Sequence, residues 1–75
     1  MNGNENENEI RKILMNFNDY FPDGLVIKNT TYRMDEKRQI EKATRARTIV
    51  LTVAEAIEMI SNNLSVIETE MKLNK

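Results

Sequence analysis

The stretch Thr48-Ile49-Val50-Leu51-Thr52-Val53-Ala54-Glu55 decides the fold, because it fits two incompatible structures. Five of the six residues from Thr48 to Val53 are β-branched, which favours a strand. Thr52 and Glu55 also have the Ser/Thr-x-x-Glu spacing of a capping box, which opens a helix at Val53. On this interpretation residues 47–51 form a strand and the last helix begins at residue 53.

The competing interpretation is one long helix that runs through the stretch. Apolar residues recur at alternating spacings of three and four, as the a and d positions of a coiled coil do. They are Ala43, Ala46, Val50, Val53, Ile57, Ile60, Leu64, Ile67 and Met71. Residues 35–61 contain no Gly, Pro or Asn that would mark a turn, and residues 35–43 are rich in strong helix formers. A helix over residues 35–72 would be about 57 Å long.

We therefore expect an all-α protein, with a short N-terminal helix, a loop or short extended segment, and a long C-terminal helix that packs in an oligomeric bundle. The alternative is an α+β fold with strands near residues 25–28 and 47–51, which would pair with each other, and a C-terminal helix over residues 53–72. The two interpretations share the helix from residue 53 onward.

The N-terminal part of the chain predicts a helix over residues 7–20. Its apolar residues fall on one helical face; they are Ile10, Ile13, Leu14, Phe17 and Phe21. The sequence Phe21-Pro22-Asp23-Gly24 ends this helix, because Pro-Asp-Gly is typical of turns. Residues 1–6 are rich in Asn and Glu and are expected to form a disordered tail, followed by a single small helical domain over residues 7–75.

The size of the chain points to self-association. A chain of 75 residues buries only about 60% of the surface that it exposes when unfolded. It has no cysteine for disulfides and no histidine for a zinc site, so oligomerisation is the expected source of further stability. The predicted interface of a homo-oligomer, first of all a dimer, is the apolar seam Val50, Val53, Ile57, Ile60, Leu64, Ile67 and Met71.

The residue types give no support for catalysis or for a cofactor. Glu55 and Glu58 have the spacing of helix neighbours, but no histidine accompanies them as a general base. A phosphate-binding loop cannot be built from two glycines at positions 3 and 24, and no calcium-loop pattern is present. We expect a non-enzymatic protein without metal or cofactor.

Two sets of residues are candidate contacts for a partner. Arg38, Lys42 and Arg45 would share one face of a helix over residues 33–47, with Arg47 close by, which favours contact with nucleic acid phosphates. The total charge is nevertheless balanced, with 11 basic and 12 acidic residues. The aromatic residues Tyr20, Phe21 and Tyr32 are candidate anchors for a protein partner.

The resulting hypothesis is a small oligomeric interaction protein that binds itself and another macromolecule, which it regulates or inhibits. The short Asn-rich chain without enzymatic motifs is typical of phage or mobile-element proteins of this kind. The alternative is a nucleic-acid-binding regulator that uses the basic helix. No signal-peptide pattern and no apolar run of about 18 residues occurs, so we expect a cytoplasmic protein without membrane contact.

Overall fold

The stretch from Thr48 to Glu55 forms a strand followed by a capped helix. The computed structural model describes residues 3–73, and in it Thr48–Val50 is strand β4 and Val53–Asn62 is helix α3. The Glu55 N–H donates to Thr52 Oγ1 at 3.1 Å, and the Thr52 N–H donates to Glu55 Oε1 at 2.9 Å. The capping box predicted from the sequence is confirmed, and the long helix through residues 35–72 is wrong.

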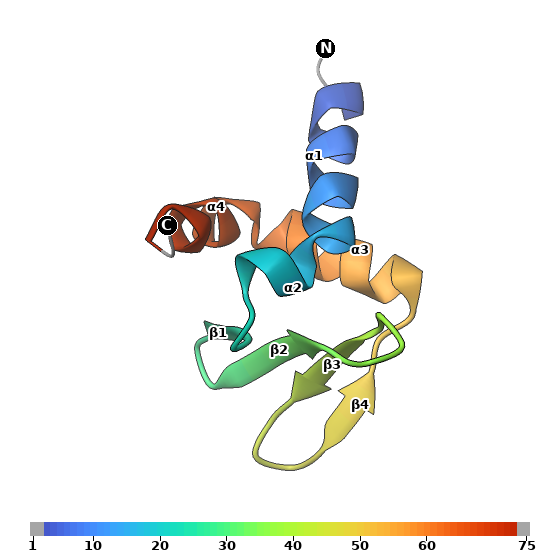
Figure 1. Cartoon of the computed structure of the whole chain (residues 1–75), viewed down its shortest axis with the longest axis vertical. Helices are drawn as coiled ribbons and strands as arrows, with labels where there is room; N and C mark the ends of the chain where they lie inside the picture. The colour runs from blue at the N-terminus through green and yellow to red at the C-terminus, as the bar shows by residue number, and fades with distance from the viewer. Residues whose placement is uncertain (1–2, 74–75) are drawn as a thin grey trace.

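The fold is α+β, with helices before and after a four-stranded antiparallel sheet. The remaining elements are α1 (Gly3–Met15), α2 (Phe17–Tyr20), β1 (Leu25–Ile27), β2 (Thr30–Met34), β3 (Ile40–Ala43) and α4 (Leu64–Leu73). The strands follow each other in the order β1-β2-β3-β4, so that β1 and β4 are the two edges. The helices lie on one side of this sheet, and no described element covers its other face (Figure 1).

The turns of the sheet are held by residues other than glycine. Lys28, between β1 and β2, has a positive φ of 56°, and Arg38, between β2 and β3, has a φ of 63°. Asp35 Oδ1 accepts hydrogen bonds from the N–H groups of Lys37 and Gln39, both at 2.9 Å. This side-chain acceptor organises the turn between β2 and β3, as Asp commonly does.

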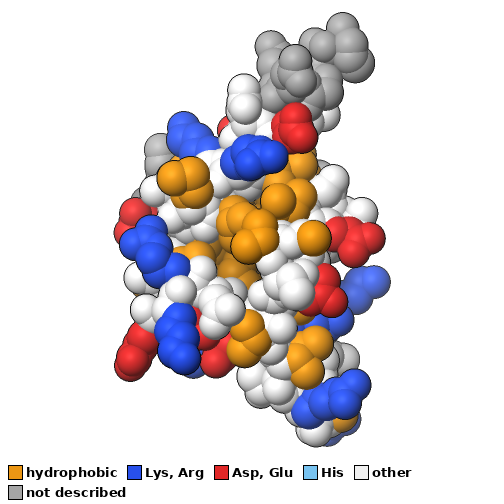
Figure 2. Space-filling view, turned by 90° about the vertical axis from the view of Figure 1, so that its right-hand side faces the viewer, with side chains coloured by type: hydrophobic (Ala, Val, Ile, Leu, Met, Phe, Trp, Pro, Cys, Tyr) orange, Lys and Arg blue, Asp and Glu red, His pale blue; other side chains and the backbone are white. Residues whose placement is uncertain are grey.

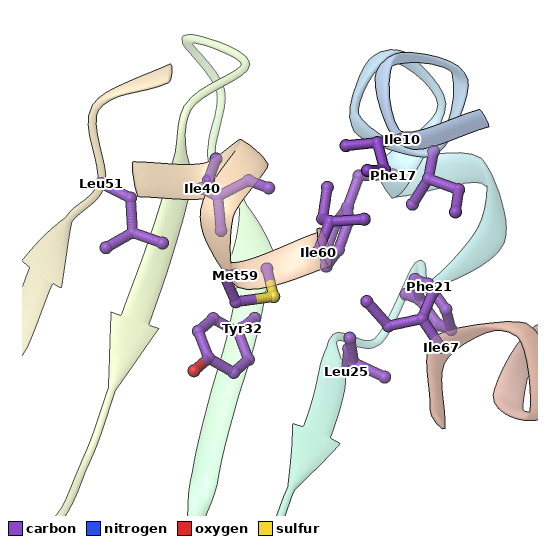
Figure 3. Packing of buried hydrophobic residues seen from close by; sticks show 12 residues of the cluster. Ile10, Phe17, Phe21, Leu25, Tyr32, Ile40, Leu51, Met59, Ile60 and Ile67 are labelled. Carbon is purple, nitrogen blue, oxygen red and sulfur yellow. The ribbon is translucent and has the colours of Figure 1, made fainter. Parts of the chain in front are cut away.

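The core lies between the helices and the inner face of the sheet. Its buried residues are Ile10, Ile13, Phe17, Phe21, Leu25, Tyr32, Ile40, Leu51, Ala56, Met59, Ile60 and Ile67. Figure 3 shows how α3 and α4 take part: Ile60 of α3 lies with Phe17, and Ile67 of α4 lies with Phe21 and Leu25. One cluster therefore joins both ends of the chain to the sheet.

The coiled-coil bundle expected from the heptad spacing is wrong for a physical reason. The seam residues belong to three different elements, so their spacing does not describe one helix: Val50 is in β4, Val53 to Ile60 in α3, and Leu64 to Met71 in α4. Ile60 and Ile67 are fully buried in the core of the single chain. The molecule is a small α+β globule instead.

The α+β alternative is closer to the structure but is also incomplete. It places strands near β1 and β4 and begins the last helix at residue 53, where α3 begins. It pairs residues 25–28 with residues 47–51, whereas β1 pairs with β2 and β4 pairs with β3. Strand β3 was missed because residues 35–43 resemble a helix in composition, and β2 lies in the part that was expected to be a loop or short extended segment.

The two ends of the chain differ in detail from the prediction. Helix α1 begins at Gly3, before the predicted start at residue 7, and its first turn overlaps the tail expected over residues 1–6. Residues 1–2 of that tail lie outside the described part. The C-terminal helical region is divided at Asn63, which separates α3 from α4. Within residues 3–73, no helix is both long enough and apolar enough to cross a membrane.

Candidate functional site

Two hairpin turns at the same end of the sheet carry basic side chains. In an antiparallel meander, the turns that follow the first and the third strand lie at one end of the sheet. Lys28 lies in the first of these turns, and Arg45 and Arg47 lie in the other, which follows the end of β3 at Ala43; Lys42 lies in β3 itself. Basic side chains gather at the bottom of the molecule in Figure 2, over the β3–β4 hairpin. We call Lys28, Lys42, Arg45 and Arg47 the basic end.

The segments that form the basic end contain no acidic residue. Neither residues 24–34 nor residues 42–54 include Asp or Glu. Glu41 precedes the second segment, but it lies directly opposite Arg33 across β2 and β3, where the two charges offset each other. Lys42 lines a groove together with Glu55 and Glu58. Excess positive charge is therefore strongest at the two turns.

The β3–β4 turn is closed by the side chain of Thr44. The Thr44 N–H donates to the Arg47 carbonyl at 2.9 Å, and Thr44 Oγ1 donates to the same carbonyl at 3.2 Å. The Arg47 N–H in turn donates to Thr44 Oγ1 at 3.4 Å. These bonds hold a four-residue turn without glycine, and so they present Arg45 and Arg47 on a short, ordered hairpin.

An exposed apolar strip adjoins the basic end along β4. Ile49 is 40% exposed, Val50 48% and Val53 69%. Hydrophobic side chains are visible along the middle of the face shown in Figure 2 and continue toward the basic tip. Ile49 and Val50 follow each other in the strand, so their side chains lie on opposite faces of the sheet at its β4 edge. Exposed apolar residues at such an edge are typical of protein contact surfaces. We call Ile49, Val50 and Val53 the β4 strip.

The main-chain groups of β4 alternate between β3 and open space. The Leu51 N–H donates to the Ile40 carbonyl at 2.8 Å, and the Thr44 N–H donates to the Arg47 carbonyl at 2.9 Å. In an antiparallel ladder these bonded pairs alternate with non-bonded pairs. Ile49 therefore turns its N–H and C=O toward β3, whereas Thr48 and Val50 turn theirs toward the open side of the edge.

The structure separates the basic residues that the sequence placed on one helix. Lys42, Arg45 and Arg47 come together at the basic end. Arg38 lies in the β2–β3 turn at the opposite end, where its Nη2 donates to the Met15 carbonyl at 3.3 Å. The basic helix over residues 33–47 is wrong, because these residues form the end of β2, two turns, and β3. Lys28 was missed, since only the meander topology brings it near this hairpin.

The predicted aromatic anchors belong to the core. Phe21 is 2% exposed and Tyr32 9%, so neither ring is available to a partner. Tyr20 is half-buried beside Phe21, with ring centroids 6.4 Å apart. Removing large apolar rings from water stabilises the folded state, which explains why these rings pack in the core.

Most of the predicted oligomer interface also packs within the single chain. Ile60 and Ile67 are fully buried, and Ile57, Leu64 and Met71 are partly buried against the core. Of the seven residues, only Val50 and Val53 remain exposed. The part of the predicted interface that remains exposed is thus at β4 and the start of α3.

A cleft away from the basic end offers no arrangement of groups that indicates a ligand. It encloses about 460 Å³ between the α1–α2 junction and the β2–β3 turn, and its lining includes Asp19, Glu36 and Arg38. Among the residues that the structure describes, no group of three or more acidic side chains could hold a metal ion. The cleft is open and mostly polar, and we assign no ligand to it.

Comparison with known proteins adds no relative from which a role could be transferred. No protein-family model matches the chain, and no curated protein and no solved structure matches it significantly.

Proposed function

We propose that this chain is a non-enzymatic interaction protein that binds an acidic surface of another protein through the basic end, and so regulates or inhibits that protein. The observation that carries the proposal is the cluster of Lys28, Arg45 and Arg47 in two turns that contain no carboxylate. A local field of one sign attracts a partner of opposite charge and raises the association rate.

The β4 strip supports a protein as the partner. Ile49, Val50 and Val53 are exposed at the strand and helix start that follow the cationic hairpin, with Ile49 on the helix side of the sheet and Val50 on its uncovered face. Protein interfaces combine an apolar centre with a polar rim. A phosphate backbone offers no comparable partner for the exposed valines.

Nucleic acid is the second candidate partner, and the β3–β4 hairpin is the observation that favours it. Two arginines on a narrow hairpin are able to contact phosphates or enter a minor groove. Single-stranded nucleic acids are normally bound by stacking of their bases on exposed aromatic rings. Because Phe21 and Tyr32 are buried, a single-stranded target is not favoured.

The proposal includes a cytoplasmic setting, in keeping with the cysteine-free chain, and it requires no metal or cofactor. An inhibitor of the phage or mobile-element type would act in this manner, by covering a functional surface of its target.

Charge reversal at the hairpin tests the proposal. The variant Arg45→Glu/Arg47→Glu and the control Arg11→Glu/Lys37→Glu change the net charge equally, but the control acts at exposed positions away from the basic end. Each protein is used to capture partners from a lysate of the source organism. We expect the native chain and the control to retain the same acidic protein, and the hairpin variant to lose it. Equal capture by all three would overturn the proposal.

A direct binding assay separates the two partner classes. In fluorescence anisotropy at low salt, we expect no binding of the native chain to duplex DNA or duplex RNA, and therefore no difference between the native chain and the hairpin variant. If the native chain binds either duplex, and log K falls linearly with log salt concentration, the second candidate replaces the first.

A further inference from the structure

We propose that two copies of this chain associate by pairing their β4 edges in antiparallel fashion, which joins two four-stranded sheets into one of eight strands. The inference begins from the open side of β4. The N–H and C=O groups of Thr48 and Val50 point away from β3, and so each edge offers two donors and two acceptors. An exposed row of such groups is a template for another strand.

Only one antiparallel register uses all of these groups. When Ile49 faces Ile49 of the second copy, Thr48 lies opposite Val50 of the second copy at both ends of the pairing. Both are bonded pairs, which makes four main-chain hydrogen bonds across a twofold axis. A slip by one residue would place Thr48 opposite Ile49, whose main-chain groups already bond to β3. The edge is thus self-complementary in the way that a twofold interface requires.

The side chains at this register suit burial. Ile49 of each copy meets its equivalent at the axis, in a non-bonded pair whose Cβ atoms lie about 4.5–5.5 Å apart. Val50 of one copy lies beside Thr48 of the other on the uncovered face of the sheet. Since Ile49 and Val50 are 40% and 48% exposed in the single chain, pairing would remove apolar surface from water.

Charge complementarity favours a second copy as the occupant. Arg45 and Arg47 precede β4, whereas Glu55 and Glu58 follow it. Antiparallel pairing places Arg47 opposite Leu51 of the second copy. Leu51 lines a groove with Glu55, Glu58 and Lys42. Since the two carboxylates outnumber the one ammonium group there, the cationic hairpin of each copy would meet a net negative groove of the other. Parallel pairing would instead bring like charges together.

The other edge of the sheet is less suited to pairing. In the β1–β2 hairpin, Ile27 and Thr30 flank a two-residue turn and form a bonded pair, so Leu25 and Ile27 direct their main-chain groups toward β2 and only Val26 directs its groups toward the open side. A basic residue flanks each edge strand, Lys28 after β1 and Arg47 before β4, so these flanking charges do not distinguish the two edges. The difference lies in length, because the run from Thr48 to Ala54 continues beyond β4 without a charged residue.

Self-association and the proposed function share Arg45 and Arg47, and so a bound partner and a second copy would compete for the hairpin. The pairing itself does not depend on the proposed function, because its test contains no other protein. Since the interface is small, the dimer should be of the weak, concentration-dependent class.

The test compares two valines that occupy matched positions on the two edges. Val50→Lys places a charge on the β4 edge, and Val26→Lys places the same charge on the β1 edge, where the native valine is 60% exposed. Sedimentation equilibrium is recorded between about 10 µM and 1 mM, a range suited to weak interfaces. The native chain and Val26→Lys should rise from 8.8 kDa toward twice that mass, while Val50→Lys stays monomeric.

A second measurement needs no variant. Amide exchange of Thr48 and Val50 in the native chain should slow as concentration increases, while that of Val26 should not change. A native chain that remains monomeric at the highest concentration would overturn the proposal. So would a Val50→Lys variant that dimerises as the native chain does, or protection that increases at β1 rather than at β4.

Discussion

Replacing Thr52 by alanine should destabilise the protein by a predictable amount, because Thr52 is the N-cap of α3. Its Oγ1 accepts the hydrogen bond from the Glu55 N–H at 3.1 Å. Alanine leaves that N–H without its capping partner, and loss of such a cap costs about 1 kcal/mol. For a domain of this size, that change lowers Tm by about 4–8 °C. Thermal unfolding followed by far-UV circular dichroism measures the shift.

Thr52→Ser provides the matched control. Serine keeps the hydroxyl oxygen that caps the helix, so its Tm should lie much closer to that of the native chain than to that of Thr52→Ala. The reasoning is refuted if alanine and serine give the same Tm. It is also refuted if both leave Tm unchanged, as they would if residue 52 lay on the exposed side of a continuous helix.

Four further outcomes follow from burial and backbone geometry. Ile60→Ala should cost about 2–5 kcal/mol, because the native side chain is fully buried, and urea unfolding will measure it. Val53→Ala should change stability by less than about 0.5 kcal/mol, since Val53 is 69% exposed. A loss of stability equal to that of Ile60→Ala would instead indicate that both residues lie in one buried seam. At Lys28, whose φ is 56°, glycine should be more stable than alanine by about 1 kcal/mol, and the reverse order would contradict the turn geometry. At Arg38, whose φ is 63°, glycine should likewise be more stable than alanine. Both substitutions remove the hydrogen bond to the Met15 carbonyl, so its loss affects the two variants equally.

The helical parts of the fold could be predicted from the sequence because their signals are local. Apolar spacing marks the first helical region, Pro22 and Gly24 mark its end, and the Thr52–Glu55 spacing marks the start of α3. Each signal depends on residues within one or two turns of chain. Their positions agree with α1, α2 and α3 to within a few residues.

The β2–β3 and β3–β4 hairpins were missed because their turns contain no Gly, Pro or Asn. Gly, Pro and Asn are absent from residues 35–61, and this absence favoured a long helix. In the structure, Asp35 Oδ1 and Thr44 Oγ1 accept main-chain hydrogen bonds that hold the two hairpin turns. Arg38 adopts a positive φ that glycine would adopt more readily. Threonine, aspartate and arginine also occur in helices, so the sequence alone does not identify them as turns.

The basic end shows why charged residues are difficult to group from sequence. Arg38, Lys42 and Arg45 share a face only if the chain is helical. In the meander, Arg38 lies at one end of the sheet and Arg45 at the other. Lys28 joins the group although it is distant in sequence, because alternate turns of a meander lie at the same end. Both proposals depend on this topology, and especially on β4 as an edge strand.

Hydrogen exchange at residues 48–51 tests the strand assignment of β4 most directly. In a dilute solution of single chains, the N–H of Ile49 and Leu51 should exchange slowly, because both point toward β3. The N–H of Thr48 and Val50 should exchange rapidly, because both point toward solvent. Two-dimensional NMR of the uniformly ¹⁵N-labelled native chain resolves the four amides. Alternating protection is the result that the structure predicts, and uniform protection of all four, as in a continuous helix, would contradict it.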